Sequence, residues 1–143
     1  PRSLQVFPFG SNDITNDIAL VLRVSLEEAE QLKLGGNQAI GLKKKLDEII
    51  EARLTDIFEL VEAHLKKIGR NGLLPAGIII VGAGGNLENI ERLAKTSLRL
   101  PAKLFDVSQA SHLKNQIRDA SWVVAYGLCL SGFGLVPNEG GLA

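Results

Sequence analysis

Four consecutive residues in the middle of the chain, Gly82 to Gly85 (GAGG), have the composition of a turn that holds an anion or a nucleotide. They follow the apolar run 77–81 (GIIIV), which is typical of a strand buried in a parallel sheet, and precede 86–98, whose amphipathic pattern predicts a helix. Glycine lets a ligand approach the backbone, and a helix start presents unpaired N–H groups. The turn is therefore a candidate nucleotide cradle, while the same spacing also suits a turn that only packs the strand against the helix.

The spacing of these glycines separates the classes of nucleotide site. A dinucleotide fingerprint needs glycine at its first, third and sixth positions; Gly82 and Gly84 fit, but Leu87 occupies the sixth. Asp106, just past a second short strand predicted at 102–105, stands where an acid that binds a ribose is expected, so a Rossmann-type dinucleotide-binding domain stays open. A Walker phosphate loop is excluded because no Gly-Lys-Ser/Thr follows the turn.

The polar stretch after residue 105 holds the residue types of a nucleophilic site: Asp106, Ser108, Ser111 and His112. No Gly-x-Ser-x-Gly elbow accompanies them, so we do not predict a hydrolytic triad. Cys129 is the one cysteine, and His64 and His112 are the two histidines. These counts exclude a disulfide framework within the chain and disfavour a metal centre.

The segment from Leu42 to Ile68 predicts one long helix, because its apolar residues recur with i, i+3, i+4 spacing. The apolar stripe consists of Leu46, Ile49, Ile50, Ile57, Leu60, Val61 and Ile68. Arg53 and His64 fall inside it. Because an unpaired buried charge is costly, Arg53 needs a carboxylate, a backbone carbonyl or a partner, unless its stem lies along the core and its head reaches water.

Charged residues gather at two further places. Lys43, Lys44 and Lys45 open the long helix, where cations oppose the helix macrodipole, and this local misfit indicates a partner outside the chain. An acidic cluster, Glu27, Glu28 and Glu30, lies in a shorter helical segment and is typical of a solvated helix face.

The remaining segments complete an α/β pattern. Residues 4–9 predict an incoming strand, and residues 11–23 predict a helix capped by Asn12 or Asp13. A capping-box pattern, Ser25 with Glu28, opens the next helix, which two glycines at 35 and 36 end.

The C-terminal region predicts a last helix, 120–133 (ASWVVAYGLCLSGF), apolar enough to be buried, with Trp122 and Cys129 in the core. A glycine-rich loose tail follows at 134–143. With two strands and a helix at 77–105 forming a βαβ unit, the chain is expected to belong to the α/β class.

Composition bounds the function. The length of 143 residues suits one domain, and 16 basic against 16 acidic residues leave no net charge, so no global field attracts nucleic acid. At 45% hydrophobic and 22% charged residues, the chain has the composition of a folded domain. No apolar run reaches the roughly 18 residues of a membrane span, and the N-terminus has no signal-peptide build, so we expect a soluble, cytosolic protein.

Four segments, in this order and spacing, resemble the FtsA family of bacterial cell-division proteins, which are actin-like ATPases. The most specific is SNDITNDIALVLRVSLEEAEQLK, at 11–33. KLDEIIEARLTDIFELV is similar to the family's long helix, LPAGIIIVGAGGNLENIERLA to its adenosine motif, and DASWVVAYGL to its closing helix. A PilM-like pilus-assembly homologue of actin shares part of these motifs and is the nearer alternative.

The resemblance implies a partial actin-like (ribonuclease H-like) ATPase lobe, with short strands, several helices and one long helix. Residues 1–143 would be a single unit, the adenine-side subdomain of the second lobe. The family's phosphate loops do not occur in this sequence, so the chain is expected not to be an enzyme by itself. The implied cofactor is ATP, with Mg in the intact protein, and the chain alone is expected to hold half a pocket at most. The residues that match the adenosine side are Gly82, Ala83, Gly84, Gly85 and Asn86, with Glu27 and Glu30 from the adenine-side helix.

The family also implies partners. The C-terminal tail of the tubulin-like FtsZ is expected to dock on this subdomain near the long helix, with Arg53, Lys44 and Lys45 as the contact residues. The intact protein would self-associate as an actin-like protofilament and act at the inner face of the cell membrane, at the division site. The membrane contact would come through a C-terminal amphipathic helix that has no counterpart in this sequence. No nucleic acid is expected as a partner.

Overall fold

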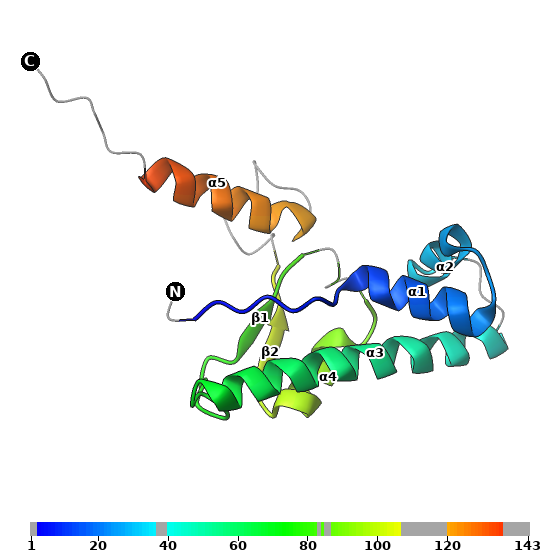
Figure 1. The fold of residues 1–143 in the computed structure, drawn as a ribbon, viewed down its shortest axis with the longest axis horizontal. Helices are drawn as coiled ribbons and strands as arrows, with labels where there is room; N and C mark the ends of the chain where they lie inside the picture. Colours follow the sequence, from blue (N-terminus) through cyan, green and yellow to red (C-terminus); the bar gives the residue numbers. More distant parts are fainter. Residues whose placement is uncertain (1–2, 37–39, 83, 85–86, 107–119, 136–143) are drawn as a thin grey trace, which may run out of the picture.

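The chain forms a mainly helical structure with a small sheet. The computed structural model describes residues 3–36, 40–82, 84, 87–106 and 120–135. Its elements in chain order are α1 (Ser11–Leu22), α2 (Leu26–Lys33), α3 (Ile40–Lys67), β1 (Ile78–Ile80), α4 (Ile90–Leu98), β2 (Ala102–Leu104), a 3₁₀ turn (Ala120–Trp122) and α5 (Val123–Leu135). Figure 1 shows α3 running along the molecule, with α1 and α2 beside its N-terminal half, the strands nearer its C-terminal end, and α5 beyond the strands.

The predicted βαβ unit is confirmed. Strands β1 and β2 pair in parallel, with Ile78 opposite Ala102 and Ile80 opposite Leu104, and α4 connects them. The pairing continues at both ends, because the Ile78 N–H donates to the Pro101 carbonyl and the Phe105 N–H donates to the Ile80 carbonyl. Strand order and helix crossover therefore place the glycine turn at the carboxyl end of β1.

The core is built around one side of α3. Its buried residues recur with the helical spacing that the sequence predicts, four positions apart except for one step of seven. They are Leu46, Ile50, Leu54, Phe58 and Leu65. Helix α1 adds Ile14 and Ile18, and helix α4 adds Ile90, Leu93, Ala94 and Leu98. Because α3 contacts both α1 and α4, its apolar stripe joins the N-terminal helix pair to the βαβ unit.

Three boundary predictions are wrong for local reasons. Residues 4–9 do not form a strand, since the described sheet contains β1 and β2 alone and offers this segment no ladder. Asn12 and Asp13 do not cap α1; Gly10 is the N-cap residue, and Asp13 lies one turn in, where its carboxylate accepts from the Gly10 N–H at 2.7 Å. The helix expected from residue 86 begins at Ile90, because Asn89 adopts a left-handed backbone with φ of 66°.

The N-cap residue of α2 is as predicted. Ser25 is its N-cap, and its hydroxyl oxygen accepts from the Glu28 N–H at 3.2 Å. After the helix, Gly35 has φ of +90°, a conformation that favours glycine and ends the helix.

The last helix forms as predicted but is not buried. Trp122 is 66% exposed, Phe133 is 79% exposed, and Cys129 is exposed too, so the prediction that they lie in the core is wrong for the described structure. The physical reason is that α5 is apolar on all sides, and the described elements cover none of them well. Helix α5 also includes residues 134 and 135, the start of the expected loose tail, whose remainder lies outside the described residues. None of the described helices is long and apolar enough to cross a membrane.

A substitution at Gly77 tests the close approach of the start of β1 to the residue before β2, Pro101. Its φ is +75°, and a Cβ added there would lie 2.0 Å from the Pro101 carbonyl oxygen. We expect Gly77→Ala to lower the free energy of unfolding in urea by about 3 kcal/mol or more, because the clash adds to the roughly 1–2 kcal/mol cost of a left-handed alanine.

The matched control is Gly72→Ala, since Gly72 also has positive φ (+69°) but has open space around the added Cβ. It should cost only the backbone term, about 1–2 kcal/mol. Equal losses for the two variants would show that the close approach of Gly77 to Pro101 does not matter.

Candidate functional site

Arg53 meets a carboxylate of its own chain. Its Nε donates to Asp17 Oδ2 at 2.6 Å, and its Nη2 donates to Asp17 Oδ1 at 2.8 Å, which makes a bidentate pair between α3 and α1. Asp56 Oδ2 lies 3.9 Å from Nη1, and the guanidinium lies 5.8 Å from the Phe9 ring centroid. The hydrogen bonds to Asp17 raise the pKa of Arg53 further above its usual value. Among the predicted alternatives, the structure thus shows the intrachain carboxylate, with the Arg53 side chain 25% exposed.

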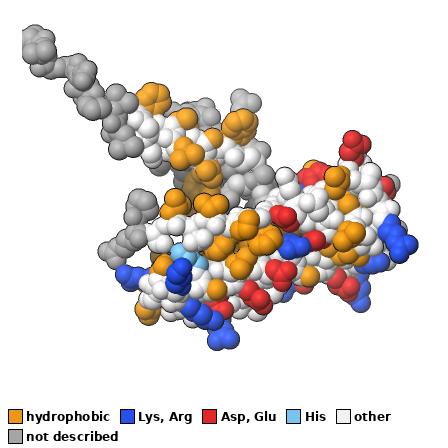
Figure 2. All heavy atoms as spheres, viewed as in Figure 1, with side chains coloured by type: hydrophobic (Ala, Val, Ile, Leu, Met, Phe, Trp, Pro, Cys, Tyr) orange, Lys and Arg blue, Asp and Glu red, His pale blue; other side chains and the backbone are white. Residues whose placement is uncertain are grey.

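Two hollows open beside this pair, and Arg53 lines both of them. The first, of about 430 Å³, is lined by Asp17, Val21, Lys45, Glu48, Ile49, Ala52, Arg53 and Asp56. The second, of about 480 Å³, is lined by Phe9, Arg53, Asp56, Ile57, Glu59 and Leu60. They share Arg53 and Asp56 and run along one face of α3. Figure 2 shows hydrophobic side chains gathered where the segment before α1 approaches α3, with charged side chains around them.

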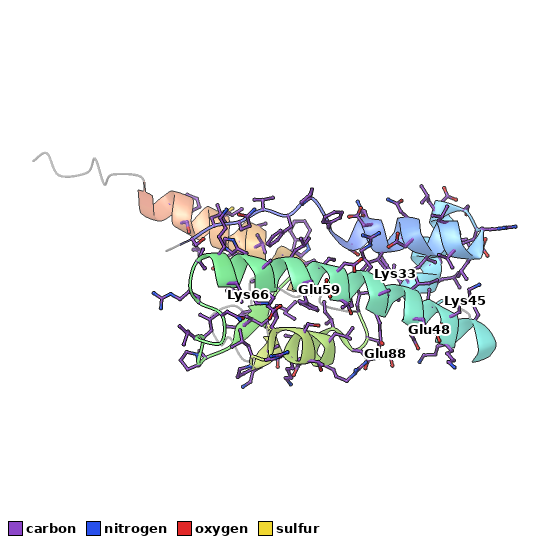
Figure 3. All side chains as sticks on the ribbon, turned by 60° about the horizontal axis from the view of Figure 1, so that its bottom comes forward. Lys33, Lys45, Glu48, Glu59, Lys66 and Glu88 are labelled. Atoms are coloured by element: carbon purple, nitrogen blue, oxygen red, sulfur yellow. The ribbon has the colours of Figure 1, made fainter. Side chains whose placement is uncertain are left out.

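The predicted basic residues are not equivalent. Lys45 lines the first hollow, whereas Lys44 is exposed and lines neither. Lys43 is turned toward Glu88, whose Oε2 lies 3.3 Å from Nζ. Figure 3 shows Lys45 and Glu48 on the N-terminal half of α3 and Glu59 further along it. The structure therefore places Lys45 and Arg53 together and leaves Lys44 apart.

In the described part of the glycine turn, Gly84 lines a hollow together with the start of α1 and the first residue of α4, Ile90. Gly82 has φ of +102°, and the hollow that Gly84 lines is the third, of about 220 Å³. The other walls come from β1, α3, the first turn of α1 and the first residue of α4, and include Ser11, Phe58, Ile80 and Ile90. The prediction that the turn leads directly into a helix N-terminus is wrong, since α4 starts only at Ile90. Ala83, Gly85 and Asn86 lie outside the described residues.

A polar network that the sequence did not reveal joins α1 to α2. The Lys33 side chain, 3% exposed, donates to the Ser11 carbonyl, to the Ser11 hydroxyl and to Thr15 Oγ1, and its Nζ lies 2.7 Å from Glu30 Oε2. Thr15 Oγ1 donates to the same Glu30 oxygen at 2.5 Å. The bonds from Lys33 and Thr15 lower the pKa of Glu30. Glu27 is exposed and makes no such contact in the described structure.

Two signals could have revealed this network. Glu30 and Lys33 stand three apart in the sequence, the spacing of an ion pair along one helix face. Thr15 lies directly beside Ile14 in the apolar stripe of α1, where a hydroxyl needs a partner. The pair Asp17 and Arg53 gave no such signal, because 36 positions separate the two residues.

The remaining candidates stay apart from these hollows. Asp106 is exposed after β2, while Ser108, Ser111 and His112 lie outside the described residues. His64 Nε2 lies 3.2 Å from the Ser3 hydroxyl, and its ring meets Phe7 edge-on. Among the described residues, no three His, Cys, Asp or Glu side chains gather as a metal site would require.

A comparison of the sequence with known families covers the segments that form these elements. The family model for "Cell division protein FtsA" matches residues 1–127. The chain belongs to the FtsA family. This FtsA-family chain is 26% identical to the cell division protein FtsA of Pseudomonas aeruginosa, over 99% of its own length and 39% of that protein. It is 29% identical to FtsA of Bacillus subtilis over 88% of the chain and 32% of that protein, and 25% identical to FtsA of Escherichia coli K12 over 72% and 32%.

The chain therefore spans between about a third and two fifths of the length of these FtsA relatives. It is a partial FtsA actin-like domain: five described helices and a two-stranded parallel sheet. Family membership supports the FtsA resemblance over the PilM-like and Rossmann alternatives, and it connects the chain with cell division.

Glu30 gives this FtsA-family chain a pH-dependent stability. Because its folded-state pKa lies below its ordinary value of 4.5, the stabilisation is present above about pH 4.5 and is lost as the pH falls through the lowered folded-state pKa. We expect Glu30→Gln to lower the free energy of unfolding by about 1 kcal/mol at pH 7, a value reduced by the partial exposure of the Glu30 side chain.

Urea unfolding at pH 7, 5, 4 and 3 measures this difference, which should shrink toward zero at the lowest pH. Glu27→Gln, on the same helix, is the control and should show a small difference that does not change with pH. A Glu30→Gln difference that stayed constant across this range would contradict the role of the ionised carboxylate.

Proposed function

We propose that this chain is the part of an FtsA-type adaptor that binds the C-terminal tail of FtsZ, and that the tail occupies the two hollows beside Arg53. Family membership supports the link with cell division, and the paired hollows are the observation that supports the site. In this proposal Arg53 and Lys45 border the bound segment, while Lys44 contributes only long-range charge.

The shape of the surface suits a short peptide. Its lining from Lys45 to Leu60 extends for about 22 Å along α3, at about 1.5 Å per residue. Val21, Phe9 and Leu60 are 46%, 44% and 36% exposed, so apolar area is available for burial on binding. A groove of this length with half-exposed apolar walls resembles sites that accept an amphipathic helix or an extended segment with apolar anchors.

The other roles of an FtsA-type adaptor, membrane attachment and self-association, are proposed to need the whole protein. We propose that it acts at the inner face of the cell membrane, at the division site, and that self-association as a protofilament and membrane attachment involve regions beyond the surfaces described above. The chain by itself is proposed to be a binding module without catalytic activity.

Ala52 offers a test of the docking site, because it is exposed, lines the first hollow and takes no part in the Arg53 pair. We expect Ala52→Trp to fill the hollow and to weaken binding of an FtsZ tail peptide at least about tenfold, or about 1.4 kcal/mol. Fluorescence anisotropy with the labelled tail of Pseudomonas aeruginosa FtsZ measures the affinity.

The matched control is Ala63→Trp, the same change at an exposed position of α3 that lines neither hollow. It should leave the affinity unchanged, and both variants should melt within a few degrees of the wild-type chain. If the two variants bound the peptide equally well, the hollows beside Arg53 would not be the docking site.

We further propose that the third hollow is the adenosine side of an ATP site. Its position between the glycine turn and the first turn of α1 supports this, since Gly84 allows a close approach and the α1 start presents N–H groups. The proposed adenosine side also includes Gly82, which begins the same turn. Glu27 and Glu30 are proposed to contribute from α2, the helix that follows α1 in the chain. Glu30 would have to give up its bonds to Thr15 and Lys33 in order to reach a base or ribose. Mg would be held with the phosphates, by the rest of the protein.

A thermal-shift assay tests the nucleotide proposal. ATP and ADP at millimolar concentration should raise the melting temperature of the wild-type chain, because a ligand that binds only the folded state stabilises it. Gly84→Leu should abolish the shift by filling the hollow, while Gly41→Leu, at an open position of α3, should retain it. A shift with NAD and none with ATP or ADP would instead support a dinucleotide site.

A further inference from the structure

The loop that joins α3 to β1 contains a chemically reactive pair of residues. Asn71 is followed by Gly72, and this is the one Asn-Gly step in the sequence. Because glycine has no Cβ, the backbone nitrogen after the asparagine is unshielded and the backbone around it rotates freely. Asparagine is a thermolabile residue, and in this setting the nitrogen can attack the amide of the preceding side chain. Figure 1 shows the loop between the end of α3 and β1.

The structure presents this step to water. Every residue from 66 to 73 is exposed, and a Cβ placed on Gly72 would meet nothing within 4 Å. Asn71 and Gly72 are the two central residues of a turn, which the Leu73 N–H closes by donating to the Arg70 carbonyl at 3.0 Å. Gly72 has φ of +69°, as the third residue of a type II turn requires. The step therefore lies outside the helices and strands, in the kind of segment whose backbone is most mobile.

Backbone hydrogen bonds distinguish Asn71 from the other described asparagines. The N–H of Gly72 makes no hydrogen bond in the part of the chain that the structure describes. Asn12 and Asn89 are each followed by a residue whose N–H donates to a carbonyl three positions back, at 3.1 and 3.4 Å. Asn16 lies inside α1, where the next N–H belongs to the helix. Among the described asparagines, Asn71 alone is thus followed by a free backbone nitrogen.

The charges near the step favour attack by this nitrogen. Lys66, Lys67 and Arg70 lie in the same exposed segment, and the sequence has no acidic residue between Glu62 and Glu88. The nitrogen must lose its proton before it attacks, and nearby cations favour an anion. The electrostatic environment therefore lowers the cost of forming the nucleophile.

We propose that Asn71 is a site of spontaneous deamidation, with water as the other reactant. The Gly72 nitrogen gives its proton to solvent and bonds to Cγ of Asn71, while Nδ2 takes up a proton and leaves as ammonia. Water then opens the resulting five-membered succinimide. Cleavage of the new bond to Cγ gives aspartate, and cleavage of the original peptide bond gives isoaspartate. Nothing is oxidised or reduced, and the net change replaces an amide by a carboxylate.

The two products differ in the backbone. Aspartate keeps the turn, whereas isoaspartate adds one carbon to the chain between the Arg70 carbonyl and the Leu73 N–H, so the hydrogen bond that closes the turn no longer fits. The next residue, Leu74, packs against the core, and its carbonyl accepts from the Gly77 N–H at 2.9 Å. A displaced turn therefore disturbs the start of β1. The isoaspartyl form has a weaker junction between α3 and β1 than the aspartyl form.

Peptide mapping by mass spectrometry tests the site, after incubation of the chain at mildly alkaline pH and physiological temperature. Asn71 should lose its amide at least about tenfold faster than Asn16 or Asn89, because the nitrogen after it is both unbonded and unshielded. The peptide containing residue 71 should also accept methyl groups from S-adenosylmethionine through an isoaspartyl methyltransferase.

The matched variant is Asn71→Gln, in which the same attack would have to close a six-membered ring. It should stay unmodified at this position, and the methylation of that peptide should disappear. Loss of the amide from wild-type Asn71 at the rate seen for Asn16 would overturn the proposal.

Thermal melting tests the effect on the junction. The aged wild-type chain should melt about 2–4 °C below freshly purified Asn71→Asp, because its isoaspartyl fraction lacks one hydrogen bond. Asn71→Asp carries the new charge on an unchanged backbone, so it controls for charge. Asn71→Gln aged in parallel controls for other damage and should melt like the fresh protein. Equal melting of aged wild type and Asn71→Asp would show that isoaspartate does not weaken the junction.

Discussion

The burial of one stripe of α3 holds this structure together. Five side chains along it, Leu46, Ile50, Leu54, Phe58 and Leu65, are each at least nine-tenths buried. Helix α1 packs on this helix from one side and α4 from another, and the strands β1 and β2 are attached through α4. Each fully buried leucine-sized side chain contributes roughly 1.5–3 kcal/mol to the free energy of unfolding, more than a typical surface ion pair contributes. Every hollow described above has a wall on α3, so the geometry of each depends on how this stripe packs.

The pair between Arg53 and Asp17 shows how a charge is tolerated at the border of that stripe. A guanidinium next to apolar side chains loses hydration, and two hydrogen bonds to a carboxylate of α1 replace part of it. The pair also links α1 to α3, and its Arg53 lines both hollows. Because Asp17 satisfies Arg53, the electrostatic character of the surface depends on the residues that are left: one lysine and a row of carboxylates on α3.

Elements governed by local patterns could be predicted from the sequence, and contacts between distant residues could not. The i, i+3, i+4 stripe placed α3 within two residues of its observed start and one of its end, and the β-branched run at 77–81 placed β1. Ser25 capped α2 as its spacing with Glu28 predicted. The partner of Arg53 was beyond reach, because no periodicity connects residues 17 and 53.

Other predictions were wrong where one local sequence pattern is compatible with two different structures. An amphipathic pattern from residue 86 fits a helix that starts there or at Ile90, and only the left-handed backbone of Asn89 decides between them. The apolar sequence of α5 predicted a helix correctly and its burial wrongly. Hydrophobicity favours burial of a helix but does not identify the element that packs against it. In the candidate site, the glycine turn was found from spacing, whereas no pattern in the sequence indicated that Glu48, Asp56 and Glu59 line hollows on α3.

The proposed nucleotide and peptide sites share walls, and this has a thermodynamic consequence. Phe9 and Ile57 line both the second and the third hollow, so each of these side chains forms part of the wall of both proposed sites. Ile57 is half-buried and Phe9 is 44% exposed, so both side chains have room to move when a ligand contacts them. A ligand that shifts Phe9 or Ile57 in one hollow changes the shape of the other, and any change in affinity that results is reciprocal: the factor by which nucleotide alters peptide binding equals the factor by which peptide alters nucleotide binding. In this FtsA-family chain, a connection between the two proposed sites would thus run through two side chains that line both hollows, without requiring a movement of whole subdomains.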